Sequence, residues 1–290
     1  MSVMRASTQS DAALDSLHLS PKGFVRFARY ITSELGIKMP ESKASMLQSR
    51  LARRIRELGF NSVEQYGEYL FSSNHGDERE YFINAITTHK TDFFREPEHF
   101  AFLVQKALPA LTSAGSSSRT VHLWSAACSS GEEPYTLAMT LGEYVRSHPA
   151  WDFAILATDV STKVLARARQ GIYTEEEAAP VPPEMCRRYL LKGRERAHRM
   201  VRVVPTLREK ISFHRLNLIA KDYRVKDYFD VIFLRNVLIY FDKALQERVI
   251  NRLCRHLKPG GYLFVGHSES LADFEVPVER VHISVYRLPM

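Results

Sequence analysis

The stretch Val121-His-Leu-Trp-Ser-Ala-Ala-Cys-Ser-Ser-Gly-Glu-Glu-Pro-Tyr-Thr-Leu-Ala-Met139 decides the fold of this chain. It predicts a short apolar strand over Val121–Ser125, then a turn of small residues, then the start of a helix. Pro134 is tolerated in a first helical turn, because its missing N–H would have no partner within the helix. This order is typical of the first crossover of an open α/β sheet, where nucleotide-like ligands bind. An ordinary structural turn without a ligand is an equally good interpretation of this stretch alone.

The turn Ala126–Gly131 has almost no side-chain bulk, so a ligand can approach its backbone closely. We therefore expect Ala126 and Gly131 among the ligand contacts. The turn holds a single glycine, so it lacks the G-x-G-x-x-G pattern that binds a dinucleotide pyrophosphate. The sequence also lacks the G-x-x-x-x-G-K-[ST] loop and the G-x-S-x-G elbow, which disfavours the usual ATP site and a serine hydrolase.

A second apolar strand, Phe153–Asp159, ends in a lone carboxylate. An acid at the tip of the second strand binds ribose hydroxyls in nucleotide-binding α/β folds. Asp159 is also a candidate N-cap for the helix that follows, although Ser161 can supply that cap instead. A further strand is predicted to begin at Phe229, and polar groups follow it. With the acid of the second strand, this pattern suits a nucleoside that carries an amino-acid tail. S-adenosylmethionine has that shape and requires no phosphate-binding loop.

The composition is that of an ordinary globular protein. The chain has 290 residues, of which 45% are hydrophobic and 25% charged. No apolar run approaches the roughly 20 residues that cross a bilayer, and the N-terminus lacks the apolar core of a signal peptide, so we expect no membrane insertion. The three cysteines are far apart and lack metal-ligand spacing. They indicate a cytoplasmic location and argue against a zinc site, so we expect no metal.

The net charge of +7 is unevenly distributed along the chain. Residues 22–59 carry nine Lys/Arg against three Asp/Glu, and residues 186–226 carry thirteen against three. These blocks have net charges of +6 and +10, so the rest of the chain sums to −9. Two basic blocks on an acidic body suggest contact with an acidic macromolecule, either a nucleic acid or an acidic protein surface. Solvated helix faces are the simpler alternative.

Hydrophobic periodicity divides the chain into two domains. Four helical segments predict an all-α domain over residues 1–90. Alternating strands and helices predict an α/β domain over residues 91–290, with a last strand over His282–Tyr286. About residues 186–215 break this alternation with short β-rich segments, including the one that begins at Ile211, and we interpret them as a small antiparallel insert.

Several motifs resemble those of the chemotaxis receptor glutamate methyltransferases, the CheR type. The resemblance covers about residues 20–288, and its combined strings are highly specific. The segments that carry it are Thr88–Glu96 (THKTDFFRE), Trp124–Tyr135 (WSAACSSGEEPY), Ala157–Ser161 (ATDVS), Phe229–Phe241 (FDVIFLRNVLIYF) and Leu257–Glu269 (LKPGGYLFVGHSE). It implies a Rossmann-like class I methyltransferase sheet with a small antiparallel insert, preceded by an all-α domain.

The resemblance also implies which residues contact S-adenosylmethionine and its product S-adenosylhomocysteine. Glu133 and Asp159 are expected to hold the methionine amino end or the ribose hydroxyls. Further contacts are expected from two strand ends and from the segment between the domains: Asn217 and Leu218 against the adenine, Arg235 and Asn236 on the opposite side, and Thr91 and Arg95. His89 stands where relatives commonly have an asparagine that contacts the cofactor, and a neutral imidazole still donates one hydrogen bond.

The implied reaction is methyl transfer to a glutamate side chain of a chemoreceptor, giving a glutamate methyl ester for adaptation of chemosensory signalling. A glutamate with an ordinary pKa near ~4.3 is ionised at neutral pH, so no general base is required. Arg95 and Tyr240 are the candidates to orient that carboxylate. Two alternatives stay open: a nucleic-acid methyltransferase, which the basic composition suggests, and a receptor-binding module that only senses the cofactor. Amino-group base methylators usually carry Asn/Asp-Pro-Pro-Tyr where this chain has Asn236-Val-Leu-Ile-Tyr240, so we do not expect nucleic acid as the partner.

The expected partner is therefore the cytoplasmic part of a chemoreceptor. Its contact surface is predicted on the basic helix of residues 43–58, through Arg50, Arg53, Arg54 and Arg56. The basic β insert is a second candidate surface, because edge arginines and lysines can bind an added strand or an acidic tail.

Overall fold

The computed structural model describes residues 17–72, 75–113, 120–193 and 199–290. The chain forms two compact units, residues 1–88 and residues 89–290. None of the described helices is both long and apolar enough to cross a bilayer.

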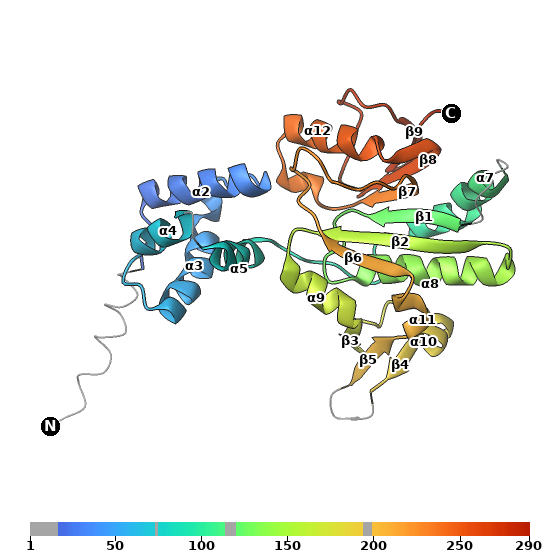
Figure 1. Ribbon diagram of the computed structural model, residues 1–290, viewed down its shortest axis with the longest axis horizontal. Coiled ribbons are helices and arrows are strands. Elements are labelled where there is room, and N and C mark those ends of the chain that lie inside the picture. Colours follow the sequence, from blue (N-terminus) through green and yellow to red (C-terminus); the bar gives the residue numbers. More distant parts are fainter. Residues whose placement is uncertain (1–16, 73–74, 114–119, 194–198) are drawn as a thin grey trace. The chain divides into compact units, whose positions relative to one another are not determined.

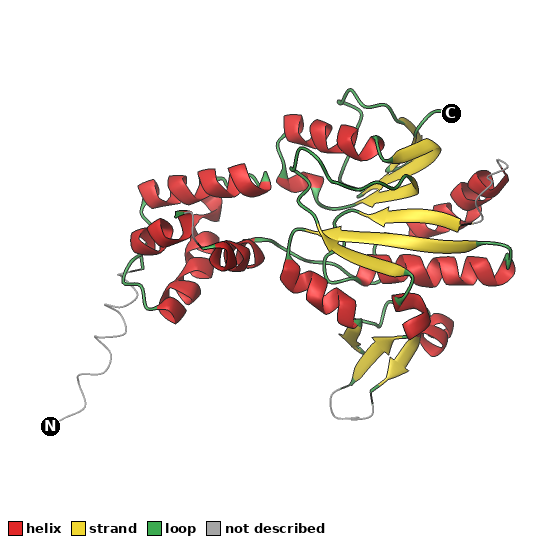
Figure 2. Cartoon of the chain, in the orientation of Figure 1, coloured by secondary structure: helices red, strands yellow, loops and turns green. Residues whose placement is uncertain are grey.

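The described part of the first unit consists of helices and the loops that connect them (Figure 2). Ser20 caps helix α2 (Pro21–Leu35) by accepting a hydrogen bond from the Gly23 amide. Gly59 ends helix α3 (Ala44–Leu58) in the left-handed conformation, which glycine adopts without strain. Each helix buries one apolar face, as the sequence periodicity predicts. The helices are α2 (Pro21–Leu35), the 3-10 turn η1 (Glu41–Lys43), α3 (Ala44–Leu58), α4 (Val63–Phe71) and α5 (Gly76–Ile86).

The second unit is built on a seven-stranded sheet with the strand order β6-β2-β1-β7-β8-β10-β9 (Figure 1). Strands β6, β2, β1, β7 and β8 are parallel, whereas β10 pairs antiparallel with both of its neighbours. Their bounds are β1 (Thr120–Ser125), β2 (Asp152–Asp159), β6 (Ile211–Arg215), β7 (Phe229–Leu234), β8 (Leu257–Val265), β9 (Glu279–His282) and β10 (Val285–Arg287).

The strand order reverses between β1 and β7. From β1 the chain passes through α8 (Glu132–Ser147) to β2 on one side, whereas from β7 it passes through α12 (Lys243–Cys254) to β8 on the other. Right-handed crossovers in opposite directions place α8 and α12 on opposite faces of the sheet (Figure 1). The switch point therefore opens at the carboxyl ends of β1 and β7, where α/β folds bind their ligands.

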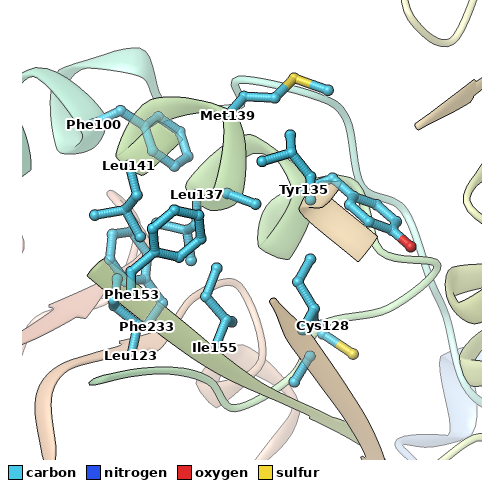
Figure 3. Packing of buried hydrophobic residues seen from close by; sticks show 14 of the residues in the cluster. Phe100, Leu123, Cys128, Tyr135, Leu137, Met139, Leu141, Phe153, Ile155 and Phe233 are labelled. Carbon is cyan, nitrogen blue, oxygen red and sulfur yellow. The ribbon is translucent and has the colours of Figure 1, made fainter. Parts of the chain in front are cut away.

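One hydrophobic core joins the sheet to α8. Leu137 and Leu141 of this helix are fully buried and pack with Leu123 of β1, Ile155 of β2 and Phe233 of β7 (Figure 3). The central strands are apolar on both faces, as is typical of a parallel sheet covered on both sides. This packing fixes the carboxyl ends of the strands relative to one another. The other helices of the unit are α6 (Pro97–Phe102), the π-helical turn η2 (Leu103–Ala107), α7 (Leu108–Ser113), α9 (Thr162–Gln170), α10 (Pro183–Tyr189), α11 (Pro205–Arg208) and the 3-10 turn η4 (Leu238–Tyr240).

A small antiparallel sheet is present, but its extent differs from the predicted 186–215. It has the order β3-β5-β4, with β3 (Ile172–Thr174), β4 (Leu190–Lys192) and β5 (Met200–Val203). Its first strand therefore precedes residue 186. Ile211–Arg215, which we expected in the insert, is β6 and pairs parallel with β2 in the main sheet. The predicted extent is wrong at both ends. A five-residue strand with alternating burial has the same sequence pattern whether it lies at the edge of the insert or at the edge of the main sheet.

The chain ends in a hairpin where the sequence suggested one strand over His282–Tyr286. Strands β9 and β10 are separate, and the turn between them contains Ser284 with a positive φ of 56°. β10 pairs with β8 on its other side, so the hairpin completes the edge of the main sheet.

Candidate active site

The small-residue turn after β1 is fixed by backbone hydrogen bonds to the neighbouring strands. The Ala126 amide donates to the Phe233 carbonyl at 2.8 Å, and the Cys128 amide donates to the Thr158 carbonyl at 2.9 Å. The Gly131 amide donates back to the Cys128 carbonyl at 3.1 Å and closes the turn before α8. The predicted strand, turn and helix are therefore confirmed, and the turn lies at the switch point.

Gly131 serves packing at this turn. Its φ is +103°, and a Cβ atom at this position would lie 2.7 Å from the Tyr173 hydroxyl oxygen and 2.9 Å from Cβ of Ala168. Only glycine fits both constraints. The missing side chain thus lets α9 and β3 approach the turn, because the space where its Cβ would lie is filled by protein.

Asp159, at the carboxyl end of β2, binds the backbone of the turn after β1 and of the turn after β2. Its Oδ2 accepts from the Ser129 amide at 3.0 Å, and its Oδ1 accepts from the Ser161 amide at 2.9 Å. Ser161 is the N-cap of α9, since its Oγ accepts from the Val164 amide at 3.3 Å. This settles the choice between the two capping residues. A backbone hydrogen bond from Val160 also acts on this carboxylate. Since an ionised carboxylate offers about four lone-pair sites, it keeps acceptor capacity for a ligand.

Burial raises the pKa of Asp159, although the backbone amide of Ser161 and the nearby His89 oppose the shift. The main chain of His89 is itself attached to the turn, because its carbonyl accepts a hydrogen bond from Ser129 Oγ at 3.1 Å. The segment that begins at residue 89 thus reaches the carboxyl end of β2.

Glu133, in the first turn of α8, lies between a hydroxyl and a guanidinium. Its Oε1 accepts from Ser125 Oγ at 2.7 Å, and its Oε2 lies 3.3 Å from Nη1 of Arg235. Burial raises the pKa of Glu133, and the charge of Arg235 opposes that rise. A partly buried carboxylate with only one guanidinium partner can accept a cationic ligand group.

Arg235 connects three segments at the carboxyl end of β7. Its side chain is only 2% exposed, and besides Glu133 it binds Glu96 Oε2 through Nη2 at 3.0 Å. Nη2 also donates to the carbonyl of Arg95. The guanidinium lies 5.5 Å from the ring centre of Phe100. Because its donors are used within the protein, Arg235 holds the 95–96 segment and Glu133 in place.

Glu96 is the counterpart of Arg235 in this network. Its Oε1 accepts from Nδ2 of Asn236 at 3.2 Å and from the His267 amide at 3.3 Å. Burial raises its pKa, but Arg235 and the hydrogen bonds from Asn236 and His267 outweigh that effect, and the net pKa is lowered. Glu96 is therefore an ionised anchor.

A second buried carboxylate, Glu269, shapes the loop after β7. It is 7% exposed and accepts hydrogen bonds from the backbone amides of Gly266 at 2.6 Å, Asn236 at 2.9 Å and Leu238 at 2.8 Å. The loop that carries Asn236 and Tyr240 is thus attached to the loop after β8. Its geometry is fixed by a residue more than thirty positions away in sequence.

Strained backbone collects around this site. Four of the seven described non-glycine residues with positive φ belong to it: Phe94 (54°), Glu96 (56°), Ser129 (50°) and Asn236 (57°). Such conformations cost of order 1–3 kcal/mol each and persist where the surroundings enforce them. The hydrogen bonds of Asp159, Arg235 and Glu269 supply that enforcement.

The remaining predicted residues lie on segments at the same end of the sheet. Thr91 and Arg95 are half-buried, and Nη1 of Arg95 donates to the Lys90 carbonyl at 3.1 Å. Leu218 is buried two residues past Leu216, whose amide bonds the Asp159 carbonyl, and Asn217 Oδ1 accepts from the Ile219 amide at 3.2 Å. Tyr240 is half-buried at the end of η4.

Sequence reasoning missed Ser125, Glu96 and Glu269. Glu96 and Glu269 are the last residues of two of the motifs quoted above, but the resemblance assigns them no role. Their partners lie 139 and 33 positions away, and no local periodicity indicates such pairings. Ser125 could have been predicted, because it is the last residue of a strand that precedes the small-residue turn.

The arginines of the basic helix α3 fall into two groups, two that hold the helices together and two that are exposed, of which Arg53 pairs with Glu57 at 3.0 Å on the surface. Arg54 pairs with the buried Glu78 at 2.6 Å, and Arg50 donates to the Ile86 carbonyl. Both are half-buried and hold α3 against α5. Arg53, with a side chain 81% exposed, and the exposed Arg56 point outward. The predicted insert contains a basic run over residues 192–199, and of its lysines and arginines only Lys192 and Arg199 are within the described residues.

Comparison with known proteins gives consistent matches over both units. Residues 22–87 match the model of the CheR methyltransferase all-alpha domain, and residues 89–286 match that of the CheR methyltransferase SAM binding domain. Among solved structures, the N-methyltransferase NodS from Bradyrhizobium japonicum, in complex with S-adenosyl-L-homocysteine, covers 65% of this chain and 69% of its own. Its identity is 16% and its TM-score 0.33, and so weak a likeness says nothing of ligand or reaction.

Relatives of known name cover most of the chain. The chemotaxis protein methyltransferase of Escherichia coli (strain K12) is 40% identical over 261 residues, covering 90% of this chain and 88% of its own. The chemotaxis protein methyltransferase of Klebsiella aerogenes is 40% identical over 92% of this chain and 91% of its own. Chemotaxis protein methyltransferase 2 of Pseudomonas aeruginosa is 38% identical, over 93% and 94%. The resemblance and the predicted fold class are confirmed, and the chain belongs to the CheR methyltransferase family.

Proposed function

We propose that this protein transfers a methyl group from S-adenosylmethionine to glutamate side chains of chemoreceptors, giving a glutamate methyl ester and S-adenosylhomocysteine. The observation that carries the proposal is the conjunction of family membership with the carboxylates Asp159 and Glu133 at the switch point. The family match disfavours the nucleic-acid methyltransferase and the cofactor-sensing module that the sequence left open.

The residues around the switch point suit a nucleoside that carries an amino-acid tail. Asp159 keeps acceptor capacity for ribose hydroxyls beside its backbone hydrogen bonds, and Glu133 is an anionic partner for an α-ammonium group. Arg95 is half-buried and supplies a cation for the α-carboxylate or for the glutamate of the receptor. We assign Ala126, Asn217 and Leu218 to the nucleoside and Thr91 and His89 to the segment that covers it. Arg235, Asn236 and Gly131 position the others.

S-adenosylmethionine supplies an electrophilic methyl group on a positively charged sulfur. The glutamate of the receptor is already ionised at neutral pH, so the protein's task is to hold a carboxylate oxygen in line with that methyl group. We assign this orienting role to Arg95 and Tyr240. A backbone fixed by Arg235 and Glu269 keeps both segments at the correct distance.

Arg95→Ala should reduce kcat roughly 100-fold, since loss of one positioned donor typically costs about 10²–10³ in rate. Cofactor affinity should fall less than about tenfold, because Asp159 and Glu133 remain. Steady-state rates and calorimetry on the same preparation separate the two effects. A variant with full activity would remove Arg95 from the methyl centre.

Cofactor affinity should decline in acid because of Glu133. The ionised form binds an ammonium group, and burial raises the pKa of Glu133, so protonation begins at a higher pH than for an ordinary glutamate. Affinity is then constant above this pKa and falls below it. Glu133→Gln should bind the cofactor more weakly at neutral pH. The slope of its binding free energy against pH should decrease by the equivalent of about one proton, measured by calorimetry from neutral to mildly acidic pH. An unchanged slope would contradict the role of Glu133.

The receptor surface that we propose is the exposed part of α3. Arg53→Ala together with Arg56→Ala should raise KM for receptor roughly 3- to 10-fold at low salt, because exposed charges increase the rate of association with an acidic partner. Salt screens such charges, so the effect should be smaller at high salt. Cofactor affinity should not change. The pair Lys22→Ala and Lys38→Ala is the charge-matched control, since both lysines are exposed on this unit but lie outside α3. Equal effects of the two pairs would indicate only net charge.

The proposed reaction can be tested with S-adenosylmethionine that carries a tritiated methyl group. Purified protein and receptor-containing membranes are incubated together and then treated with alkali. Methyl esters release volatile methanol, whereas methylated bases do not. Label that stays non-volatile, or that enters nucleic acid, would reject the carboxylate as acceptor.

A further inference from the structure

Three side chains outside the proposed cofactor contacts converge beside the site. Glu96, His99 and His267 each offer a ligand atom, and these atoms all lie within 4.8 Å of one another. Glu96 and His99 belong to the start of α6, whereas His267 follows β8. The cluster thus joins segments 168 residues apart and combines two imidazoles with one carboxylate.

His99 is the least explained of the three. It is 1% exposed, and neither of its ring nitrogens has a hydrogen-bond partner among the described residues. Its Nδ1 lies 3.5 Å from Glu96 Oε2, which is too long for a normal hydrogen bond. A buried polar group without a partner costs about 1–3 kcal/mol, so a missing ligand is the simplest explanation.

The distances suit a small ion after modest adjustment. Zinc bonds of about 2.0–2.2 Å to nitrogen and oxygen place tetrahedral ligand atoms about 3.3–3.5 Å apart. The pair formed by His99 and Glu96 already has this separation. His267 has a side chain 41% exposed, so rotation of its imidazole can close the remaining gap without disturbing the core.

The local charge also permits a cation. Glu96, Glu98 and Glu133 contribute three negative charges, and Arg235 and Arg95 contribute two positive charges. The difference is one negative charge. Glu98 Oε2 lies 3.9 Å from Nε2 of His267, on the exposed side of the cluster.

The geometry points to a binding site for a divalent transition metal of the zinc class, formed by Glu96, His99 and His267. Imidazole and carboxylate ligands are typical of zinc, and the exposed side leaves a position for water. Glu96 Oε2 also accepts from Arg235, so the ion and the guanidinium share one carboxylate oxygen. Occupancy of this site is thereby linked to the segment that carries Arg95.

The test is calorimetric titration of the metal-free full-length protein with zinc sulfate, with cobalt(II) as a spectroscopic probe of the ligand set. We expect one ion per chain. His267→Ala should weaken binding at least about tenfold, as is usual on loss of one ligand, and Glu96→Gln should do the same. His267→Ala keeps the backbone amide that donates to Glu96, so the fold should persist, and its thermal midpoint verifies this.

His214→Ala is the matched control, because His214 is an exposed imidazole on β6. It should bind zinc like the parent protein. Absence of stoichiometric zinc binding by the parent would overturn the site. Equal affinity of the parent and His267→Ala would also overturn it, since the ion would then be bound elsewhere. Both readouts are independent of methyl transfer.

Discussion

Asp159→Ala should weaken binding of S-adenosylhomocysteine by about 100-fold, equivalent to roughly 3 kcal/mol. We assign the carboxylate to two ribose hydroxyls, and hydrogen bonds to a charged group contribute about 1.5–3 kcal/mol each. The variant also leaves the amides of Ser129 and Ser161 without their acceptor in a buried position. The turn after β1 should therefore loosen, which adds to the loss of affinity.

Calorimetry on the folded variant measures this effect, with circular dichroism as the check on folding. Asp152→Ala is the matched control. Asp152 begins the same strand at its opposite end, is exposed and pairs with Lys210. Its removal should leave affinity unchanged, because exposed ion pairs contribute little. Unchanged affinity in Asp159→Ala would exclude Asp159 from the ribose site.

Arg235→Met should lower the free energy of unfolding of the second unit by about 3–5 kcal/mol and abolish measurable methyl transfer. Removal of one partner of a buried ion pair leaves the other charge uncompensated. Here two carboxylates, Glu96 and Glu133, would lose their guanidinium, and the Arg95 carbonyl would lose a donor. Chemical denaturation measures the first effect and the tritium assay the second.

Two further variants separate this mechanism from general sensitivity to arginine loss. Arg146→Met removes an exposed arginine that pairs with Glu143, and it should cost less than about 1 kcal/mol. Glu96→Gln in the Arg235→Met background should restore part of the stability, because one unpaired charge disappears. Additive losses in that double variant would show that the two residues act independently.

The central sheet could be predicted because its strands are long apolar runs with clear ends. Val121–Ser125, Phe153–Asp159 and the strand that begins at Phe229 agree with β1, β2 and β7 within a residue or two. The helix start near Pro134 was predicted from its fixed φ and missing donor, and α8 begins two residues earlier, at Glu132. At these positions local pattern and tertiary packing favour the same structure.

Short segments were harder to assign because their partners are distant in sequence. Ile211–Arg215 has five residues and alternating burial, so its pattern fits the insert and the main sheet equally. Only its parallel register with β2, from Ile155↔Ile211 to Asp159↔Arg215, distinguishes the two. The hairpin at Ser284 was missed for a similar reason, since a serine in the left-handed region carries no strong turn signal.

The carboxylates of the candidate site could be predicted from the sequence, whereas the residues that hold them in position could not. Asp159 and Glu133 stand at strand and helix ends that the sequence marks clearly. The roles of Arg235 and Glu269 come from contacts across the switch point. Cysteine spacing argued against a zinc site, but spacing along the chain cannot indicate a cluster such as His99 and His267, whose members meet only through folding.

The proposed reaction is tested most directly by identifying the atom that is methylated. Receptor-containing membranes are incubated with the protein and S-adenosylmethionine, and receptor peptides are then sequenced by mass spectrometry. We expect one added methyl group on glutamate side chains, removable by mild alkali, and its absence when Asp159→Ala replaces the parent protein. Methylation of lysine, of a backbone terminus or of nucleic acid, with receptor glutamates unmodified, would contradict the proposed reaction.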